Sequence, residues 1–365
     1  MPDWTQPMER SFEYYTVEPN SLADVKRLES IKSASFTRET DSETLGSASF
    51  DAADLLGESY IRGYLKTRQN GIAEKFPLGT YLVQTPSSSF NGKIRTVSMD
   101  AYTPLIELKE NPPPIGYTIR KGAYILDEAY RIIQENCRVP VVKVAHRMVT
   151  NDKGETVDKS PTLPYNFVAN VDDTWLSFVI DLLKCANYEL GLEETGRILF
   201  QPKQALESLQ PVWTYNDDNS SILYSDITVD HDLYGIPNKV VVVYSYGNTK
   251  FEVTVTNEDP NSPTSYVNRG RWITHRDTSP ALSGYVSEEQ VREYAERLLE
   301  ALSTVEYTVR YSHAYCPVRL GDCVRLNYTK AGLTGIKAKV VSQSFSADLA
   351  CAVSETAVFT QKLWR

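Results

Sequence analysis

The chain has 365 residues, of which 41% are hydrophobic and 11% aromatic, and its formal net charge is −9. A chain of this length can bury two or three separate cores. The acidic balance, without any block of Lys or Arg, argues against a nucleic-acid-binding surface. No run reaches the ~18 apolar residues of a membrane span, and the N-terminus lacks a charged-then-apolar signal. We therefore expect no membrane span and no export by a classical signal.

The cysteines are scattered along the chain without a CxxC pair. An odd number of cysteines at or near apolar positions is typical of buried free thiols in a protein that folds in a reducing cytoplasm. Cys316 and Cys323 flank a turn, so a disulfide between them stays open, although buried thiols are favoured. The five cysteines are Cys137, Cys185, Cys316, Cys323 and Cys351.

Residues 1–114 are dominated by predicted strands. Small or apolar side chains alternate with polar ones in SIKSASFTRE and GSASFDA, as in antiparallel strands. Gln69-Asn70-Gly71 is a hairpin turn signal, and Leu78-Gly79 precedes a further predicted strand. Ser21 to Leu28 predicts a short helical turn. We interpret this segment as a first β-barrel domain.

Asn111-Pro112-Pro113-Pro114 is a stiff break and the expected domain boundary. Apolar residues at helical spacing then alternate with short strand patterns, which predicts a small α+β domain over 115–205. The expected elements are a helix over Tyr124–Cys137, a strand over Val139–Ala145, a second helix capped by Asp172 or Asp173, and a hairpin over Leu190–Phe200 around Glu194-Thr195-Gly196.

Residues 206–365 predict a bridging segment followed by a second β-barrel domain with one packing helix. Ser287 and Gln290 form a capping box at the start of that helix. The other expected elements are a strand over Ile222–Val229, a hairpin that turns at Gly247-Asn248, a long polar loop over Asn257–Gly284, strands over Val305–Tyr311, Cys323–Tyr328 and Lys337–Val341, and a last strand that ends near Phe359.

Two pieces of the first β segment echo the last one. Leu78-Gly79-Thr80-Tyr81 is similar to Leu320-Gly321-Asp322-Cys323, and each is followed by a basic alternating strand, at 93–97 and at 337–341. Two interpretations stay open. Turn chemistry repeats in unrelated β-meanders, but two related barrels in one chain would also produce this echo.

The order of these elements resembles the tail hub, or baseplate hub, proteins of bacteriophages. The resemblance is carried by the run LGDCVRLNY … GLTGIKAKVVSQSFS … AVFTQ, by DDTWLSFVIDLLKCANYEL … TGRILFQP and by the opening RSFEYYTVEPNSLADVKRLESIKSASFTRETDSETLGSASF. It covers nearly the whole chain. It implies a mainly β chain with α+β content, in which two tail-tube-like antiparallel barrels flank a small α+β domain.

The resemblance also implies a function in the virion. A hub would be a homotrimer whose six barrels form a pseudo-hexameric ring at the end of the tail tube. Its partners would be the tail tube protein, the distal tail protein, the tape-measure end and a spike or fibre adaptor. Such a protein is assembled in the host bacterial cytoplasm and resides in the phage tail tip. It would have no cofactor and no sequence-specific nucleic-acid partner.

The residues themselves give no catalytic signature. The four histidines lie in four separate segments without HxxxH or HExxH spacing. Asp230-His231-Asp232 is the nearest candidate for a metal site, but neighbours on a strand point to opposite faces, so a solvated turn is favoured. Asp172-Asp173 and Asp217-Asp218 could be paired carboxylates, yet a helix cap and a turn fit them better. We expect no enzymatic activity and no metal.

One loop carries residues typical of an interface. Arg269, Arg271 and Trp272 lie together, and Arg and Trp are enriched at interface hot spots. A loop end folded back on its own domain is the competing interpretation. The alternative function for the whole chain is a receptor- or carbohydrate-binding tail-tip protein, because exposed aromatic residues on β domains also bind sugars.

Overall fold

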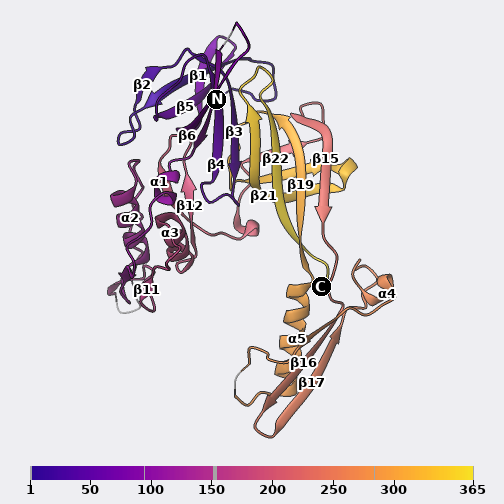
Figure 1. Ribbon diagram of the computed structural model, residues 1–365. Coiled ribbons are helices and arrows are strands. Elements are labelled where there is room, and N and C mark those ends of the chain that lie inside the picture. The colour runs from indigo at the N-terminus through magenta and orange to yellow at the C-terminus, as the bar shows by residue number, and fades with distance from the viewer. Residues whose placement is uncertain (1, 94, 151–153, 283, 365) are drawn as a thin grey trace. The chain divides into compact units, whose positions relative to one another are not determined.

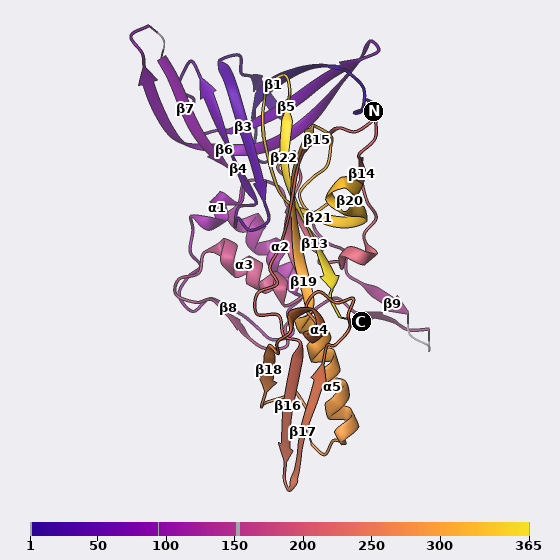
Figure 2. The ribbon, with the colours of Figure 1, turned by 90° about the vertical axis from the view of Figure 1, so that its right-hand side faces the viewer.

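The computed structural model describes residues 2–93, 95–150, 154–282 and 284–364 (Figures 1 and 2). The chain divides into two compact units. Unit 1 is Met1–Asp226 with Tyr311–Thr356, and unit 2 is Ile227–Arg310 with Ala357–Arg365. The predicted fold class, mainly β with additional α+β structure, is confirmed. The boundaries predicted after residues 114 and 205 do not coincide with this division and stay a prediction.

The first β domain is an antiparallel sheet with the strand order β3-β4-β7-β6-β5-β1-β2. The sheet curls, because Tyr14 on β1 meets Phe50 on β4 with ring centroids 6.0 Å apart. The helical turn predicted at 21–28 is wrong, since Asp24–Arg27 pairs with β1 as an edge strand. The strands are β1 (Glu9–Val17), β2 (Asp24–Arg27), β3 (Ile31–Glu39), β4 (Gly46–Ala52), β5 (Tyr60–Gln69), β6 (Ile72–Phe90) and β7 (Arg95–Tyr102).

The second β domain has the strand order β15-β19-β22-β21-β20-β14. It also curls, because Tyr215 on β14 lies 5.3 Å from Tyr311 on β19 between ring centroids. Its C-terminal strands match the predicted ones. They are β14 (Trp213–Asn216), β15 (Leu223–His231), β19 (Thr304–Ala314), β20 (Cys323–Tyr328), β21 (Leu333–Ser346) and β22 (Ala352–Lys362), with short 3₁₀ turns at Leu206–Ser208 and Thr329–Ala331.

The two β domains are joined edge to edge inside unit 1. Residues Ser342–Ser346 of β21 pair antiparallel with Ser35–Glu39 of β3, so that a single 13-stranded sheet runs through both domains. The two strands lie side by side in both ribbon views (Figures 1 and 2). We call this pairing the seam.

The two β domains have the same core topology. Strands β3, β4, β5, β6 and β7 are arranged as β3-β4-β7-β6-β5, and strands β15, β19, β20, β21 and β22 as β15-β19-β22-β21-β20. This order equates β6 with β21 and β7 with β22. The echoed sequences occupy other positions, because Leu78-Gly79 lies within β6 whereas Leu320-Gly321 is the turn before β20. The repeat is therefore one of strand order, not of those motifs.

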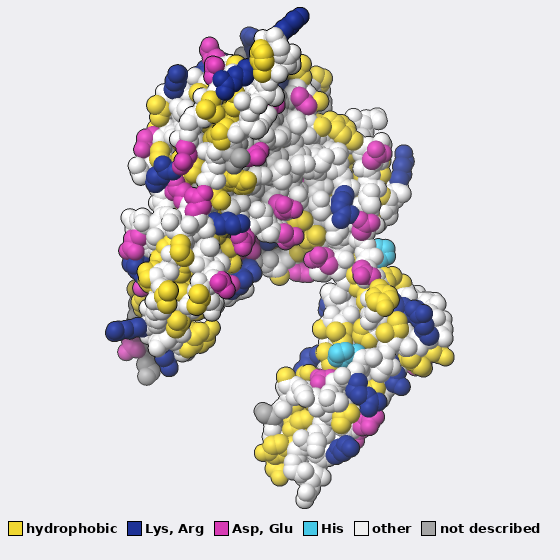
Figure 3. All heavy atoms as spheres, viewed as in Figure 1, with side chains coloured by type: hydrophobic (Ala, Val, Ile, Leu, Met, Phe, Trp, Pro, Cys, Tyr) yellow, Lys and Arg dark blue, Asp and Glu magenta, His cyan; other side chains and the backbone are white. Residues whose placement is uncertain are grey.

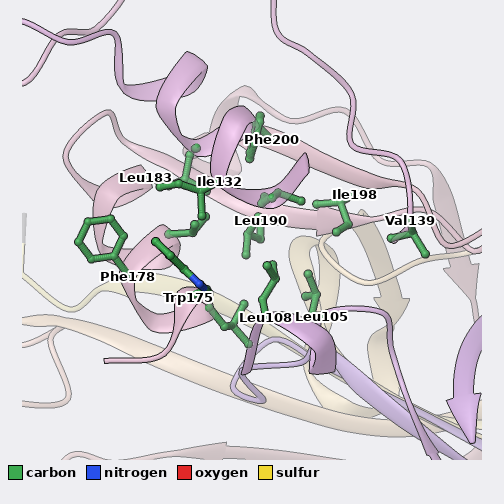
Figure 4. Packing of buried hydrophobic residues seen from close by; sticks show 14 of the residues in the cluster. Leu105, Leu108, Ile132, Val139, Trp175, Phe178, Leu183, Leu190, Ile198 and Phe200 are labelled. Carbon is green, nitrogen blue, oxygen red and sulfur yellow. The ribbon is translucent and has the colours of Figure 1, made fainter. Parts of the chain in front are cut away.

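A helical segment follows β7 and shares one apolar core with the first β domain. Figure 4 shows the apolar side chains that the helical segment contributes to this core. Leu105 and Leu108 from α1 pack with Ile132 from α2 and Phe178 and Leu183 from α3. The elements are α1 (Ile106–Lys109), β8 (Thr118–Ile119), α2 (Ile125–Asn136), β9 (Met148–Thr150), β10 (Thr156–Asp158), β11 (Phe167–Val168), α3 (Trp175–Lys184), β12 (Tyr188–Leu192) and β13 (Ile198–Pro202).

Two details of the helical segment differ from the prediction. The cap of α3 is Thr174, whose hydroxyl accepts from the Ser177 N–H, and not Asp172 or Asp173. The strand predicted at 139–145 is reduced to an isolated bridge between Val141 and Ile198, since this stretch has no further ladder partner in the described chain. The predicted helix over 124–137 and the hairpin over 190–200 are confirmed.

Unit 2 is a hairpin covered by one helix. The apolar face of α5 buries Val291, Ala295 and Leu299 against β16 and β17, and its predicted capping box from Ser287 to Gln290 is present. The long loop after the hairpin contains a short helix and a strand. The elements are β16 (Lys239–Tyr246), β17 (Thr249–Thr256), α4 (Tyr266–Arg269), β18 (Thr274–Asp277) and α5 (Glu288–Leu302). None of the described helices is both long and apolar enough to cross a membrane.

Candidate functional site

The predicted interface loop lies at the end of α4 in unit 2. The Arg269 guanidinium donates to the carbonyls of Ile236 at 2.7 Å and Leu233 at 2.8 Å, so this side chain ties α4 to its own unit. Trp272 stacks on Tyr266 with ring centroids 4.2 Å apart and remains 40% exposed. Arg271 is also exposed. The loop thus combines an internal clamp with an outward-facing aromatic pair, and its role as an interface stays a prediction.

The three residues of the candidate metal site Asp230-His231-Asp232 each contact a different partner. Asp230 pairs with Arg310, and His231 stacks on Tyr307 with ring centroids 4.6 Å apart. Asp232 accepts from the backbone N–H of Tyr234 at 2.7 Å. Among the residues that the structure describes, no group of three His, Cys, Asp or Glu side chains is placed to hold a metal ion.

The paired aspartates serve local structure. Asp173 accepts from the Asn170 N–H at 2.7 Å, just before α3. Asp217 accepts from the N–H and hydroxyl of Thr329, and these bonds hold the pKa of Asp217 below its usual value. Asp218 caps the turn at Ser220 in the same way. Asp173, Asp217 and Asp218 therefore each accept a hydrogen bond at a nearby turn or helix start.

The cysteines are free thiols with different exposure. Cys316, Cys323 and Cys351 are buried, Cys137 is half-buried and Cys185 is exposed. Burial raises the pKa of Cys351 to about 12 and likewise raises that of Cys137 to about 12. The thiols of Cys137 and Cys351 are therefore protonated and unreactive at neutral pH.

A buried polar network crosses the seam, and sequence reasoning did not find it. Arg38 on β3 donates from Nη1 to Gln343 Oε1 at 3.0 Å, and these two residues face each other in the β3–β21 ladder. Gln343 Nε2 in turn donates to Glu355 on β22. His313 Nε2 lies 3.4 Å from Glu355 Oε2, and the Tyr311 hydroxyl donates to the other carboxylate oxygen. The network connects three strands of the second domain to the first.

The oppositely charged side chains of this network, Glu355 and His313, are buried. Burial disfavours the Glu355 carboxylate, but hydrogen bonds from His313, Tyr311 and Gln343 bring its pKa below the ordinary value. Burial also opposes the His313 imidazolium, yet its hydrogen bonds to Cys316 and Glu355 raise the pKa of His313 to about 10. Glu355 is the nearer of these two partners, because its carboxylate oxygen lies 3.4 Å from the His313 ring and the Cys316 sulfur lies 3.9 Å from it. At neutral pH the pair is ionic.

A pocket of about 460 Å³ lies in unit 1 beside this network. The β3–β4 turn, the middle of β6, the β12–β13 hairpin and the turn before β20 line it. Two ion pairs join lining residues, since Arg319 contacts Glu194 at 2.8 Å and Lys339 contacts Glu189 at 3.2 Å. Both ion pairs join the second β domain to the β12–β13 hairpin, while the first β domain lines the pocket through β6 and the β3–β4 turn. Acidic and basic side chains are interspersed over the visible face of unit 1 (Figure 3).

No family model matches the sequence, and no curated protein is significantly similar to it. Solved structures do match. The tail protein from Neisseria meningitidis MC58 is 11% identical, with a TM-score of 0.57, over 96% of this chain and 97% of that one. The 43 kDa tail protein of prophage MuSo2 from Shewanella oneidensis is 12% identical, with a TM-score of 0.56, over 95% of this chain and 98% of that one.

A third match is a chain in the lidded PdpA–VgrG complex of Francisella, 10% identical with a TM-score of 0.53, over 99% of this chain and 54% of that one. Structural similarity at such low sequence identity establishes the fold alone. The chain therefore has the fold of phage tail proteins, and the resemblance seen in the sequence is confirmed at the level of fold.

Proposed function

We propose that this chain is the structural hub of a phage tail, a homotrimer that forms a pseudo-hexameric ring at the tip of the tail tube. The observation that carries the proposal is the repeated strand order, together with the seam. A chain with two equivalent β domains already joined edge to edge can extend the same joint to further copies of itself.

The edges needed for such a joint are open in the described chain. The N-terminal half of β21 pairs with β20, and its next residues, Ser342–Ser346, reach past β20 to β3. β6 is built alike, because the Val83 N–H bonds to Ser59 just before β5, as the Val340 N–H bonds to Asp322 just before β20. Beyond that bond, residues 84–90 of β6 pair only with β7. That stretch is the equivalent of the seam edge of β21.

The complementary edge belongs to β15. By strand order β15 is the equivalent of β3, and β19 is its one neighbour among the described strands. Pairing of β15 in one copy with residues 84–90 of β6 in the next would repeat the seam between copies. Pro86 lies in this part of β6, and proline in sheets is confined to edges, strand starts and bulges. Three such joints and three internal seams would close a ring of six β domains.

The tail tube protein, the distal tail protein, the tape-measure end and a spike or fibre adaptor are the partners of this hub, which is assembled in the bacterial cytoplasm and resides in the virion. Its role is non-enzymatic. If the ring encloses a conduit, its inner face is acidic or neutral, so that DNA or tape measure does not adhere. The net charge of −9 supports this expectation.

One observation favours the alternative of a carbohydrate- or receptor-binding tail-tip protein. The stacked Tyr266–Trp272 pair is partly exposed, with the Lys239 ammonium 5.7 Å from the Trp272 ring. Trp272→Ala separates the two functions. If the pair binds sugar, the substitution abolishes binding to purified host cell wall and leaves the oligomer intact. If the pair is an interface between tail proteins, wild type and variant both fail to bind cell wall.

The hub itself is tested by cross-linking the two edges. In a Cys185→Ser background, one cysteine is placed on each edge, Ser87→Cys in β6 and Thr228→Cys in β15. Ser87 and Thr228 are both exposed in this structure. We expect covalent trimers only when both cysteines are present. A matched control pairs Ser87→Cys with Ser279→Cys, which lies off the proposed edge, and should give monomers. Equal cross-linking by both pairs would contradict the proposed joint.

A further inference from the structure

The segment between α2 and α3 makes an excursion from its own core. It leaves a backbone anchor at Val142, whose N–H bonds to the Ile198 carbonyl at 2.9 Å. It returns at Leu163, whose N–H bonds to the Ala123 carbonyl at 3.0 Å. Between these points it forms the β9–β10 hairpin. None of the described residues from 145 to 160 is buried, so apolar burial does not set the position of the hairpin.

A single histidine connects both legs of the hairpin to α2. His146 precedes β9, and its Nδ1 lies 2.6 Å from Asp158 Oδ2 at the end of β10. Its Nε2 lies 2.8 Å from Asp127 Oδ2 in the first turn of α2. A neutral imidazole has only one N–H, whereas both of these short contacts are to carboxylates. The geometry therefore requires the doubly protonated imidazolium.

The surroundings of His146 favour this charged bridge. Lys143 contacts Asp127 at 3.1 Å, and the Tyr124 ring covers the imidazole with centroids 4.5 Å apart. The hydroxyl and backbone N–H of Ser160 satisfy Asp158, whose pKa lies well below its ordinary value. Because the carboxylates occupy opposite ring nitrogens, the three side chains do not converge on one point where a metal ion could bind.

We propose that His146 is a pH-sensitive pin, which holds the β9–β10 hairpin on α2 when protonated and releases it when the proton is lost. Deprotonation turns one N–H donor into a lone pair that faces a carboxylate. That contact then becomes repulsive, and the link from β10 through His146 to α2 is broken. The pin belongs to unit 1 and does not depend on the proposed ring.

The direction of the pH effect follows from the carboxylates. Hydrogen bonds to Asp158 and Asp127 raise the pKa of His146 above its ordinary value. A group with a raised pKa in the folded state contributes its full stabilisation below the unfolded-state pKa. It loses that contribution as the pH rises through the folded-state pKa. The hairpin is therefore attached at mildly acidic pH and released as the pH rises through the raised pKa of His146.

Hydrogen exchange of the full-length protein tests the pin. Protection factors, each corrected for the intrinsic exchange rate at that pH, are measured for the hairpin amides between pH 6 and 9.5. In wild type we expect protection to fall by about three- to tenfold as the pH rises. This is the effect expected from losing one partly exposed, charge-assisted hydrogen bond. Amides of α2 and α3 serve as an internal reference and should show no such step.

Two variants and a control decide the outcome. His146→Gln cannot carry the charge, so its hairpin amides should be unprotected at every pH, without a step. Asp158→Asn should lose protection at pH 6 while α2 stays protected. His275→Gln, at an exposed histidine of unit 2, should keep the wild-type step. A step that persists in His146→Gln, or wild-type protection in that variant at pH 6, would overturn the proposal.

Discussion

The core around α2 and α3 is almost wholly apolar, whereas the seam between the two β domains buries a carboxylate, an imidazole and a guanidinium. In the helical core, Phe178, Leu182 and Leu183 stabilise the fold through burial of apolar surface, and the hydrophobic effect is not directional. At the seam Arg38 and Gln343 face each other across the ladder. A slip of one residue would turn Gln343 to the other face of the sheet and break the network.

The helical core and the seam differ in how strictly they fix the position of their elements. Burial brings the helices together but tolerates small shifts, while a hydrogen-bonded ionic network accepts only one register. We propose that the same joint is repeated between copies. The register of the seam therefore decides whether the six β domains are evenly spaced around the proposed ring. The network therefore specifies the register of the seam.

The largest effect should come from breaking the buried pair on one side. Glu355→Ala leaves the His313 imidazolium buried without its carboxylate, which should cost about 3–5 kcal/mol of unfolding free energy. Chemical denaturation measures it. The double variant His313→Leu/Glu355→Leu removes both charges and should lose clearly less. Additive losses in the double variant would mean that the two residues do not act as a pair.

A similar loss of unfolding free energy is expected from an apolar substitution in the helical core. Phe178 is buried, so Phe178→Ala should cost about 3–5 kcal/mol through lost burial and a cavity. The loss should be the same at pH 6 and pH 9, because no titrating group is removed. A loss that changes with pH would show that this core is coupled to the polar network.

The seam, in contrast, should depend on pH. Because the pKa of His313 is raised from 6.5 to about 10 in the folded state, its contribution is full below pH 6.5 and declines up to about pH 10. Compared with His313→Gln, wild type should lose about 2–5 kcal/mol more over that range. Denaturation of both proteins at each pH measures the difference. Parallel profiles would contradict an ionic seam.

The smallest effect should come from the helix caps. Thr174→Ala and Ser287→Ala each remove a capping hydroxyl, from α3 and α5, and should cost about 1 kcal/mol. Thermal unfolding would detect this. Thr174→Ser, which keeps the hydroxyl, is the control and should be close to wild type. Equal losses for the Ala and Ser variants would mean that the cap bond contributes little.

Much of the fold could be predicted because apolar spacing reports on burial. The face of α5 with Val291, Ala295 and Leu299 follows a helical period, and its cap is a local sequence pattern. A second barrel-like domain was implied by the resemblance, but its strand order was not predicted. Periodicity failed at Asp24–Arg27, where all four side chains are exposed and only backbone pairing with β1 makes the strand.

The polar sites could not be predicted because their members are distant in sequence. Arg38 and Gln343 are 305 residues apart, and each is an ordinary polar residue in an alternating strand. His146 and its aspartates come from three elements, which made the four histidines look isolated. A polar residue at an inward-facing strand position, such as Glu355 between Val353 and Ala357, was the one local signal of the network.

The most direct test of the ring is the solution mass of the purified protein, combined with class averages from electron microscopy. Three copies, each with two β domains, predict a closed trimer with six-lobed pseudo-symmetry, and the β6–β15 cysteine pair should cross-link within it. A closed assembly of another order, or a trimer in which that cysteine pair does not cross-link, would contradict repetition of the seam between copies.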